Sequence, residues 1–456
     1  MYVRLVNQNK TRQKRIARRI FLSRTHTNKK QNHSHIKTNK RSASLEQTDM
    51  ETQRQRNVEK ETRGPSPRKK RRRNALCQAM VSPKMKLFLD EIQASKAAVC
   101  SHAPDAPHAQ KSLRPSDFNI VQQNVQKSLR SWDFDIFEFL SDVRHVVSQD
   151  EILPLVSSLI FNDMSDELAS IGVNRKCLNN YMQSINKQYL KNPFHNSLHG
   201  ADVGQTVYSL LCSGTWHRTL AAVDKFALVV AAFSHDVGHN GENNQFLVQS
   251  GSILALRDGE ESVLEKMHLR ISWDTLELEN CNFLKTMSLS NKRRFAHVFK
   301  ISILGTDNAK HFEKLNALKA LVESKRNGEG ETTGSVKVCG DRHDEDLDLI
   351  LELVVHAADI SNPTKAYVDG PYKIWCANIM EEFYALGDKE RDLGLSVTDI
   401  FRREKSVQEV QTGFTKFFVR PLFVALGDIE GFDMQRPLDR IEENLAYWDS
   451  TTSSKK

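Results

Sequence analysis

The chain lacks any apolar run long enough to cross a bilayer. Its longest run, around Phe226–Phe233, is far shorter than the roughly 20 residues that a transmembrane helix needs, and no apolar signal-peptide core opens the chain. The seven cysteines are widely spaced and form no Cys-x-x-Cys pair, which argues against a thiolate metal site and is typical of reduced proteins. We therefore expect an intracellular, cytoplasmic protein without a membrane span.

Acidic residues are scarce at the N-terminus. Residues 1–74 hold 23 Lys and Arg but only five Asp and Glu, and very few aromatics. Such a segment buries too little apolar surface to offset the entropy of ordering it, so we predict a disordered basic tail over 1–74. The rest of the chain has 42 basic and 52 acidic residues, which argues against a nucleic-acid-binding surface on the folded body.

The tail ends in a cationic run at residues 67–73, Pro-Arg-Lys-Lys-Arg-Arg-Arg. One interpretation is an electrostatic address that contacts nuclear import factors or an anionic surface, and the other is a merely solvated tail. Residues 1–25 are Arg-rich and contain no acid, so an organelle presequence is a third interpretation. The sequence alone does not choose among the three.

Helical periodicity dominates the remainder. After a proline-containing connector at 75–117, apolar residues recur at three- and four-residue steps from about Ser131 to Trp448, without convincing strand alternation. This predicts an all-α, multi-helix domain over 118–450, with a short C-terminal tail at 451–456. The Gly-, Thr- and Ser-rich segment Ser324–Arg342 is expected to be a surface loop.

Two histidine pairs stand at i,i+4 spacing, His195 with His199 and His235 with His239. On a helix, this spacing places both imidazoles of a pair on one face, where they can converge on one ion. Asp236 directly follows His235 and offers a hard oxygen ligand. An isolated pair of this kind is more often structural than metal-binding, so the pairs alone decide little.

The combination of His199, His235, Asp236 and Asp359 is more informative. Asp359 closes an apolar helical stretch, where a buried carboxylate needs a partner and a metal ion suffices. Two imidazoles and two carboxylates suit zinc or another transition ion, and a bridging aspartate would let a harder ion such as magnesium bind beside it. Two adjacent divalent ions that share a hydroxide are a known device for in-line attack on a phosphodiester.

At this point the sequence resembles a known family, the class I 3′,5′-cyclic-nucleotide phosphodiesterases of the HD type of metal phosphohydrolase. The resemblance is closest to cAMP-preferring members and covers roughly residues 130–450. It rests on five stretches that follow in order: F-H-N-S-L-H-G-A-D-V-G-Q at 194–205, H-D-V-G-H-N-G-E-N-N-Q-F at 235–246, H-A-A-D-I-S-N-P-T-K at 356–365, I-M-E-E-F at 379–383, and Q-T-G-F at 411–414.

The resemblance implies hydrolysis of cyclic nucleotides to 5′-monophosphates by a metal-bridged hydroxide, which ends a cyclic-nucleotide signal. It implies two divalent ions, Zn²⁺ with Mg²⁺ or Mn²⁺, and assigns a role to each candidate residue. His199, His235, Asp236 and Asp359 would hold the first ion, with Asp236 also reaching the second, and His239, Glu265 and Thr306 would hold its waters. His195 would protonate the departing O3′, as a histidine near neutrality can.

The resemblance also implies a substrate pocket. Gln411 would hydrogen-bond the purine edge, Phe414 would stack on the base, and Ile379 and Phe383 would line the opposite wall. His195, Asp236 and Asp359 would face the phosphate. Asn362, in a Ser-Asn-Pro context, favours adenine, so we predict a preference for cAMP over cGMP; the competing interpretation is that Asn362 simply caps the turn before Pro363.

Four positions depart from the family pattern: Phe194 stands for a common Tyr, Gly200 for a small apolar residue, Gly238 for an acid and Met267 for a histidine. None removes a proposed metal ligand. The histidines His217, His268, His297, His311 and His343 lie outside the constellation and are expected to be surface or structural residues, and His356 to be a buried, hydrogen-bonded neighbour of Asp359.

Two alternatives stay open. One is a broader HD-type phosphohydrolase that acts on nucleotide mono- or triphosphates, which would have no need of the purine-binding pair Gln411 and Phe414. The other is a non-catalytic anchoring or nucleic-acid-associated factor, against which the intact ligand set and His195 argue.

Overall fold

The computed structural model describes residues 125–144, 147–329, 334–338 and 345–453. Across these residues the structure is helical and contains no strand; the single β-bridge joins Val336 to Ile429. The helices are α6 Ile136–Val143, η1 Gln149–Glu151, α7 Ile152–Asp163, α8 Ser165–Ser170, α9 Arg175–Gln188, α10 Ser197–Cys212, η2 Trp216–Thr219, α11 Ala222–Ser234, α12 Asn244–Gln249, α13 Ile253–Asp258, α14 Val263–Glu277, α15 Leu289–Gly305, η3 Asn308–Lys310, α16 His311–Glu329, α17 Glu345–Asp359, η4 Asn362–Thr364, α18 Pro371–Asp392, η5 Asp399–Phe401, α19 Val407–Phe414, η6 Thr415–Val419, α20 Arg420–Gly427 and α21 Gln435–Ser453.

The predicted all-α fold is confirmed over these residues. The predicted tail at 1–74, the predicted connector at 75–117 and the predicted start of the domain at 118 lie outside the described residues. Of the predicted C-terminal tail at 451–456, residues 451–453 belong to α21 and the last three lie outside the described residues. None of the described helices combines the length and the apolar character that crossing a membrane requires.

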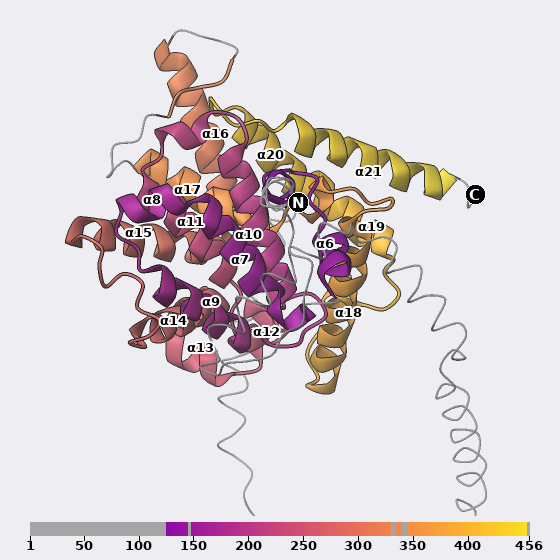
Figure 1. Ribbon diagram of the computed structural model, residues 1–456. Coiled ribbons are helices and arrows are strands. Elements are labelled where there is room, and N and C mark those ends of the chain that lie inside the picture. Colours follow the sequence, from indigo (N-terminus) through magenta and orange to yellow (C-terminus); the bar gives the residue numbers. More distant parts are fainter. Residues whose placement is uncertain (1–124, 145–146, 330–333, 339–344, 454–456) are drawn as a thin grey trace, which may run out of the picture. The chain divides into compact units, whose positions relative to one another are not determined.

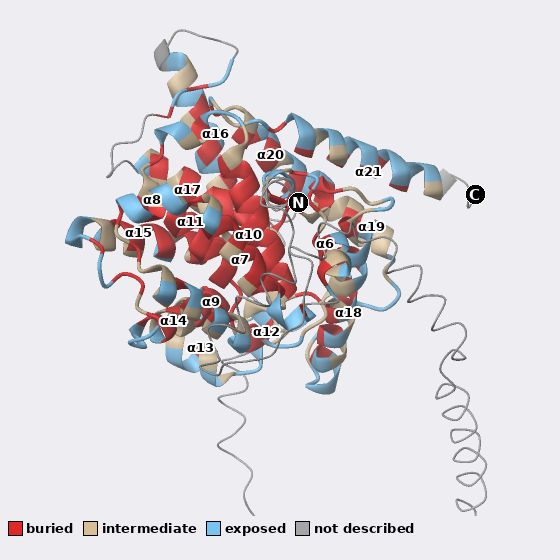
Figure 2. Cartoon of the chain, in the orientation of Figure 1, coloured by how far each residue is buried: buried red, intermediate tan, exposed pale blue. Residues whose placement is uncertain are grey.

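Helices α10 and α11 form the centre of the domain. Nearly every residue of both is buried. Helix α11 is apolar or small on most faces, whereas α10 also buries polar side chains such as Asp202, which accepts a hydrogen bond from Trp375, and Gln205, which donates one to the Leu129 carbonyl oxygen. Gly204 on α10 lies against the Phe233 ring of α11, at a distance that leaves no room for a Cβ atom. Helices α15 and α17 pack against α11, and Figure 2 shows this buried centre in red.

The ends of the central helices meet at one place. Helix α10 begins beside the ends of α11 and α17, since His199 in its first turn lies 3.1 Å from Asp359 at the last position of α17. The side chain of Asn196 caps α10 by accepting hydrogen bonds from the N–H groups of Leu198 and His199. A cap of this kind fixes where a helix starts, and here it fixes the position of His199.

The C-terminal third adds a layer of helices to this centre. Helix α18 packs against η4 and α19, and α21 packs against η4, α19 and α20. In Figure 1, α21 runs in yellow past α20 toward α19. Helix α19 begins at a capping box formed by Ser406 and Glu409, and a π-helical segment, η6, connects it to α20. A π-helical insertion of this kind often marks a functional site.

The expected loop at Ser324–Arg342 is wrong in part. Helix α16 continues to Glu329, and Val336 and Val338 are buried. Backbone hydrogen bonds from Val336 to Asp428 and from Glu430 to Val336 anchor this stretch to the end of α20. The prediction of a surface loop rested on the Gly, Thr and Ser content of the segment and gave no weight to Val336 and Val338, which are buried.

Candidate metal centre and substrate pocket

Four side chains converge where the central helices meet. His199, His235, Asp236 and Asp359 each place one ligand atom within 4.8 Å of the other three. Nε2 of His199 and Nε2 of His235 lie 3.1 and 3.2 Å from Oδ1 of Asp359, and 3.5 and 3.2 Å from Oδ2 of Asp236. The set predicted from the sequence is thus brought together by the first turn of α10, the residues that directly follow α11, and the end of α17.

The donor set fits a metal ion. A tetrahedral ion with ligands at about 2.1 Å separates those ligands by about 3.4 Å, close to the observed spacings. Nδ1 of His235 donates to the Ala232 carbonyl oxygen at 2.8 Å, so Nε2 keeps its lone pair for the cluster, as metal-binding histidines commonly arrange. Oδ2 of Asp236 is buried and accepts no hydrogen bond from the described residues.

The electrostatics of the cluster also call for a cation. Burial alone would lower the pKa of His235, but the carboxylates of Asp236 and Asp359 outweigh it and raise that pKa well above its ordinary value. Conversely, burial would raise the pKa of both carboxyls, but His235 holds them well below their usual range. Two ionised carboxylates in a buried site therefore require positive charge, from a proton or from a metal.

The expected geometry of the histidine pairs is wrong. His195 precedes the cap of α10, and His239 lies beyond the end of α11 in a turn where Gly238 has φ of +80°. Neither i,i+4 pair therefore lies on one helical face. Instead His199 faces His235, and the ring of His195 stacks on that of His239, with centroids 3.9 Å apart. Each pair straddles the end of one helix: His195 precedes the start of α10, and His239 follows the end of α11.

Glu382 on α18 holds His195. Its Oε2 lies 2.6 Å from Nδ1 of His195, and its Oε1 accepts the backbone N–H groups of Phe194 and His195 at 2.6 and 2.8 Å. Burial would lower the pKa of His195, but the charge and hydrogen bond of Glu382 outweigh it, so that pKa is raised. The sequence analysis quoted the stretch that contains Glu382 without singling it out, because only the fold brings residue 382 to residue 195.

Of the three residues expected to hold the waters of the second ion, His239 and Glu265 lie near enough to Asp236 to interact with its charge. His239 is buried, and burial with the nearby His195 holds its pKa well below its ordinary value. Burial and the neighbouring Asp307 raise the pKa of Glu265 to about 7, while Asn244 donates to its Oε2 at 2.9 Å. The Thr306 hydroxyl donates to the Ile303 carbonyl oxygen, so its lone pairs remain available.

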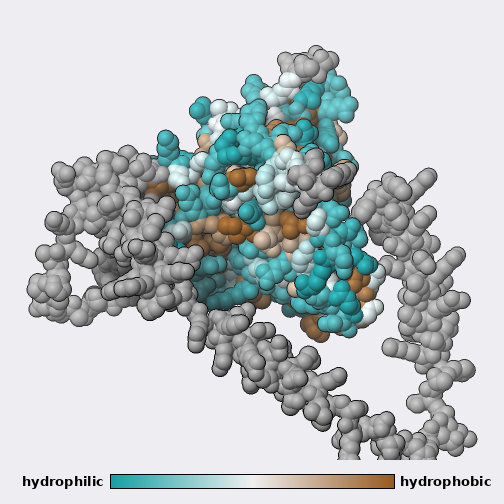
Figure 3. Space-filling model, turned by 90° about the vertical axis from the view of Figure 1, so that its right-hand side faces the viewer, coloured by the Kyte–Doolittle hydropathy of each residue, from teal (hydrophilic) through white to brown (hydrophobic). Residues whose placement is uncertain are grey.

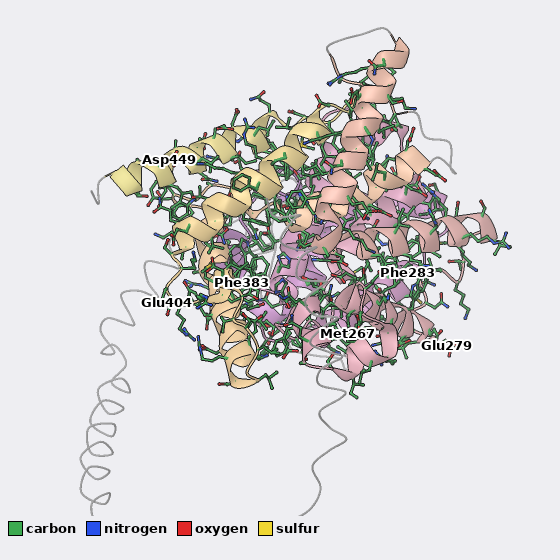
Figure 4. All side chains as sticks on the ribbon, turned by 180° about the vertical axis from the view of Figure 1, so that it is seen from behind. Met267, Glu279, Phe283, Phe383, Glu404 and Asp449 are labelled. Atoms are coloured by element: carbon green, nitrogen blue, oxygen red, sulfur yellow. The ribbon has the colours of Figure 1, made fainter. Side chains whose placement is uncertain are left out.

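His268 belongs to the site, contrary to expectation. Its Nε2 lies 3.7 Å from Oδ1 of Asp236, its Nδ1 donates to the Val237 carbonyl oxygen at 2.8 Å, and its ring stacks on His239. Met267, one residue earlier, packs in a separate apolar cluster with Leu247 and Val263. His268, and not Met267, is therefore the residue beside Asp236; Met267 is labelled in Figure 4.

The residues proposed for the purine pocket lie on α18 and α19. Gln411 is buried, and Tyr372 on α18 donates its hydroxyl proton to Oε1 of Gln411 at 3.3 Å. Phe414, one turn further along α19, is half-buried and packs on Phe418 with ring centroids 5.5 Å apart. On α18, Ile379 packs against the main core, whereas Phe383 belongs to a separate cluster with Phe246, Leu386 and Phe401 (Figure 4).

Asn362 begins the short helix η4 and is partly exposed. The residue before it, Ser361, occupies the cap position, and none of the hydrogen bonds among the described residues involves the Asn362 side chain. The side chain therefore does not cap the turn before Pro363 in this structure, which leaves its amide available to a ligand.

Two of the departures have structural consequences. A Cβ atom at Gly200 would lie 2.6 Å from the Tyr189 hydroxyl, and that hydroxyl donates to the Phe233 carbonyl oxygen at 3.1 Å. Glycine at 200 thus makes room for a tyrosine that ties α9 to the end of α11. Phe194 fills its position by packing edge-on to Trp375.

Comparisons with known proteins agree with this geometry. The model of the 3′5′-cyclic nucleotide phosphodiesterase family matches residues 194–441. Isoform F of a 3′,5′-cyclic-AMP phosphodiesterase from Drosophila melanogaster is 35% identical over 324 residues, which cover 71% of this chain and 47% of that protein. A probable 3′,5′-cyclic-AMP phosphodiesterase from Caenorhabditis elegans is 33% identical over 279 residues, which cover 61% of this chain and 40% of that protein.

A solved structure shows the same fold. The crystal structure of the phosphodiesterase domain of a rhodopsin phosphodiesterase from Salpingoeca rosetta superposes with a TM-score of 0.63 at 29% identity, covering 73% of this chain and 95% of that one. The chain spans less than half the length of the two curated relatives named above. With the family model matching more than half of the chain and the metal-ligand cluster inside the matched range, the chain belongs to the 3′,5′-cyclic nucleotide phosphodiesterase family.

Proposed function

We propose that this protein hydrolyses 3′,5′-cyclic nucleotides to nucleoside 5′-monophosphates. The observation that carries the proposal is the convergence of His199, His235, Asp236 and Asp359 on one point, with the His195–Glu382 pair directly beside it. A metal cluster next to a positioned proton donor is what cleavage of a phosphodiester with a poor leaving group requires.

His199, His235, Asp236 and Asp359 are the proposed ligands of one divalent ion, Zn²⁺, and Asp236 is the proposed link to a second, Mg²⁺ or Mn²⁺. When bound, such ions supply Lewis-acid activation of water and neutralise charge on the phosphate oxygens. His239, Glu265 and Thr306 are proposed to hold the waters of the second ion. Burial and charge neighbours keep His239 neutral, so it can accept a hydrogen bond from such a water.

His195 is the proposed general acid. Glu382 occupies its Nδ1, which leaves Nε2 to carry the transferable proton. During hydrolysis the oxygen of water bonds to phosphorus and the bond from phosphorus to O3′ breaks. The proton on Nε2 passes to O3′, so the leaving group departs as a neutral hydroxyl, and the product keeps its phosphate on O5′. Of the two protons of the attacking water, one stays on the phosphate and the other is released to solvent, from which His195 is protonated again.

The proposed substrate preference is cAMP over cGMP. Tyr372 donates to Oε1 of Gln411, and in this orientation the amide presents its N–H donors to the base. The free amide of Asn362 is proposed to contact the adenine edge, and the two curated relatives compared above carry cAMP phosphodiesterase in their names. Phe414, Ile379 and Phe383 are the proposed apolar walls around the base.

The basic tail is proposed to act as an electrostatic address, through import factors or an anionic surface. This proposal is supported by the cationic run at residues 67–73 and by the difference in charge between the basic N-terminal segment and the mildly acidic remainder of the chain.

Hydrolysis of cAMP and cGMP by the purified 456-residue chain, with and without a chelator, tests the proposal. We expect 5′-AMP as product, a higher kcat/KM for cAMP, and loss of activity after metal removal. Cleavage of nucleotide mono- or triphosphates without cleavage of either cyclic nucleotide would favour the broader phosphohydrolase alternative.

A further inference from the structure

The side-chain amide of Asn444 on α21 forms three hydrogen bonds with the backbone of the segment that follows Asn362. The side chain is buried. Its Nδ2 donates to the carbonyl oxygens of Pro363 and Lys365 at 2.8 and 2.7 Å, and its Oδ1 accepts the N–H of Tyr367 at 3.1 Å. Both N–H donors are thus used, together with the carbonyl acceptor, so this amide has a single orientation that satisfies its partners.

The same stretch of α21 also contacts the helix that carries Gln411. Nε2 of Gln408, at the start of α19, donates to the Trp448 carbonyl oxygen at 2.6 Å. The ring of Trp448 packs on Tyr367 with centroids 4.3 Å apart, and Tyr367 packs edge-on to Tyr372 at 5.5 Å. Tyr372 in turn donates to Gln411.

One helical turn of α21 therefore supports the two residues proposed to contact the base, Asn362 and Gln411, through the residues that pack beside them. Asn444 fixes the backbone next to Asn362, and Trp448, four residues later on the same face, packs on the tyrosine that supports the Gln411 anchor. Figure 1 shows α21 lying along α20 toward α19. Asn444 and Trp448 both lie beyond residue 441, where the match to the family model ends.

The turn that carries Asn362 has a second support, which makes Asn444 testable. Nε1 of Trp132 donates to the Thr364 carbonyl oxygen at 2.9 Å, and the buried Lys365 ammonium lies 4.6 Å from the centroid of the Trp132 ring. Because these contacts of Trp132 do not involve the Asn444 side chain, removing the Asn444 amide should loosen the turn without unfolding it.

We propose that Asn444 is a positioning residue for recognition of the nucleotide base: it sets the place of Asn362 and, together with Trp448, of Gln411. This inference rests on the proposed function. It concerns substrate affinity and the choice between adenine and guanine, and it leaves the chemical step to the metal cluster and His195.

The test compares Asn444→Ala with the wild-type chain. We expect KM for cAMP to rise roughly tenfold with kcat nearly unchanged, and the kcat/KM ratio of cAMP to cGMP to fall toward one. Metal content, measured by elemental analysis, should be unchanged. Since Asn444 acts through Asn362, Asn362→Ala should raise KM much less in the Asn444→Ala background than in the wild type.

Leu445→Ala is the matched control, because Leu445 is the next residue on α21, is buried in the apolar core and makes none of these hydrogen bonds. It should lower the melting temperature while leaving KM and the base preference in place. Equal changes in both variants would mean that general loosening of α21 is responsible, and would overturn the proposal.

Asn444→Asp serves where Asn444→Ala does not fold, since it keeps the size and the acceptor for Tyr367 but loses both donors. If neither Asn444 variant folds while Leu445→Ala does, Asn444 acts on global stability and the inference is overturned. An active wild type with unchanged KM and base preference in Asn444→Ala contradicts this inference alone. A wild type that cleaves neither cyclic nucleotide contradicts the proposed function, and the inference with it.

Discussion

Glu382 is the carboxylate that contributes most to the protonation of His195, and the charges of Asp236 and Asp359 add to its effect. Glu382 contacts both the ring and the backbone of His195, and its charge raises the His195 pKa above the ordinary histidine value against the opposing effect of burial. A general acid must be protonated before it donates, so the raised pKa extends activity toward higher pH.

Glu382→Gln should therefore move the alkaline limb of the kcat/KM profile to lower pH, because loss of the negative charge lowers the His195 pKa. The measurement is kcat/KM for cAMP across pH 5–9 (roughly the range in which a histidine titrates) for both proteins. An alkaline limb that stays in place, or that moves to higher pH, would argue against His195 as the acid.

His195→Ala should show whether His195 acts as the general acid or as a metal ligand. We expect turnover to fall by roughly 10²- to 10⁴-fold, with metal content unchanged, because His195 is not among the four clustered ligands. Elemental analysis next to the kinetics checks both halves. Loss of metal in this variant would show that His195 is itself a ligand.

At the residue scale, the sequence was informative where identity and spacing carry chemistry. His199, His235, Asp236 and Asp359 could be named because their types are rare in such an arrangement. Glu382 and His268 could not, because an acid on a helix and a histidine beside a methionine are ordinary features until the fold brings them to His195 and Asp236. The i,i+4 argument failed since helix ends cannot be located to within one residue from spacing alone.

At the scale of elements, α16 and α17 are joined by a buried pair of neutral histidines. Nδ1 of His311 and Nε2 of His356 lie 2.9 Å apart, which confirms His356 as a buried, hydrogen-bonded residue. Burial lowers the pKa of each to about 4. The unfolded chain therefore takes up protons first as pH falls below about 6.5, and the pair contributes stability that is lost between about pH 6.5 and 4.

His311→Gln should accordingly flatten the pH dependence of stability. Denaturant unfolding across that pH range, with a chelator present so that metal binding does not contribute, should show a smaller decline in unfolding free energy for the variant than for the wild type. A decline of equal slope in both proteins would contradict a neutral His311 in the folded state.

The contact between α18 and α19 is predicted to set base selectivity. Tyr372→Phe removes the hydroxyl that holds Gln411 and should bring the kcat/KM values for cAMP and cGMP closer together, by roughly tenfold if one polar contact is lost. Side-by-side kinetics with the two nucleotides checks this. Unaltered selectivity would assign the choice of base to other residues of the pocket.

The periodicity of apolar residues was enough to predict that the domain consists of helices. It was not enough to predict the structure of the long connecting segments. The segment after Ser324 was predicted to be a surface loop because it contains more Gly and Thr than apolar residues. Its two valines, Val336 and Val338, are nevertheless buried, and the backbone of Val336 bonds to the segment after α20. Tertiary contacts of this kind leave no local signal in the sequence.

At the scale of the whole molecule, charge divides the chain into a strongly basic N-terminus and a mildly acidic remainder. Deleting residues 1–74 should relocate the protein in cells while leaving its turnover number unchanged, because no proposed catalytic residue lies in that segment. Fluorescence localisation and cAMP kinetics on the same pair of proteins check the two statements. A large drop in turnover would make the tail part of the catalytic machinery.

The exposed face that carries α18, α19 and α21 bears apolar patches among polar surface in Figure 3. Phe417 on η6 and Ile374 on α18 are large apolar side chains with considerable exposure, at 67% and 42%.

The most direct test of the account is cAMP hydrolysis by the wild type and by Asp359→Ala, before chelation, after it, and after divalent ions are returned. We predict that the wild type forms 5′-AMP, loses this activity on chelation and regains it with the ions, whereas Asp359→Ala lacks both the metal and the activity throughout. Full metal occupancy and normal turnover in Asp359→Ala would contradict the assignment of the metal centre on which the proposed function depends.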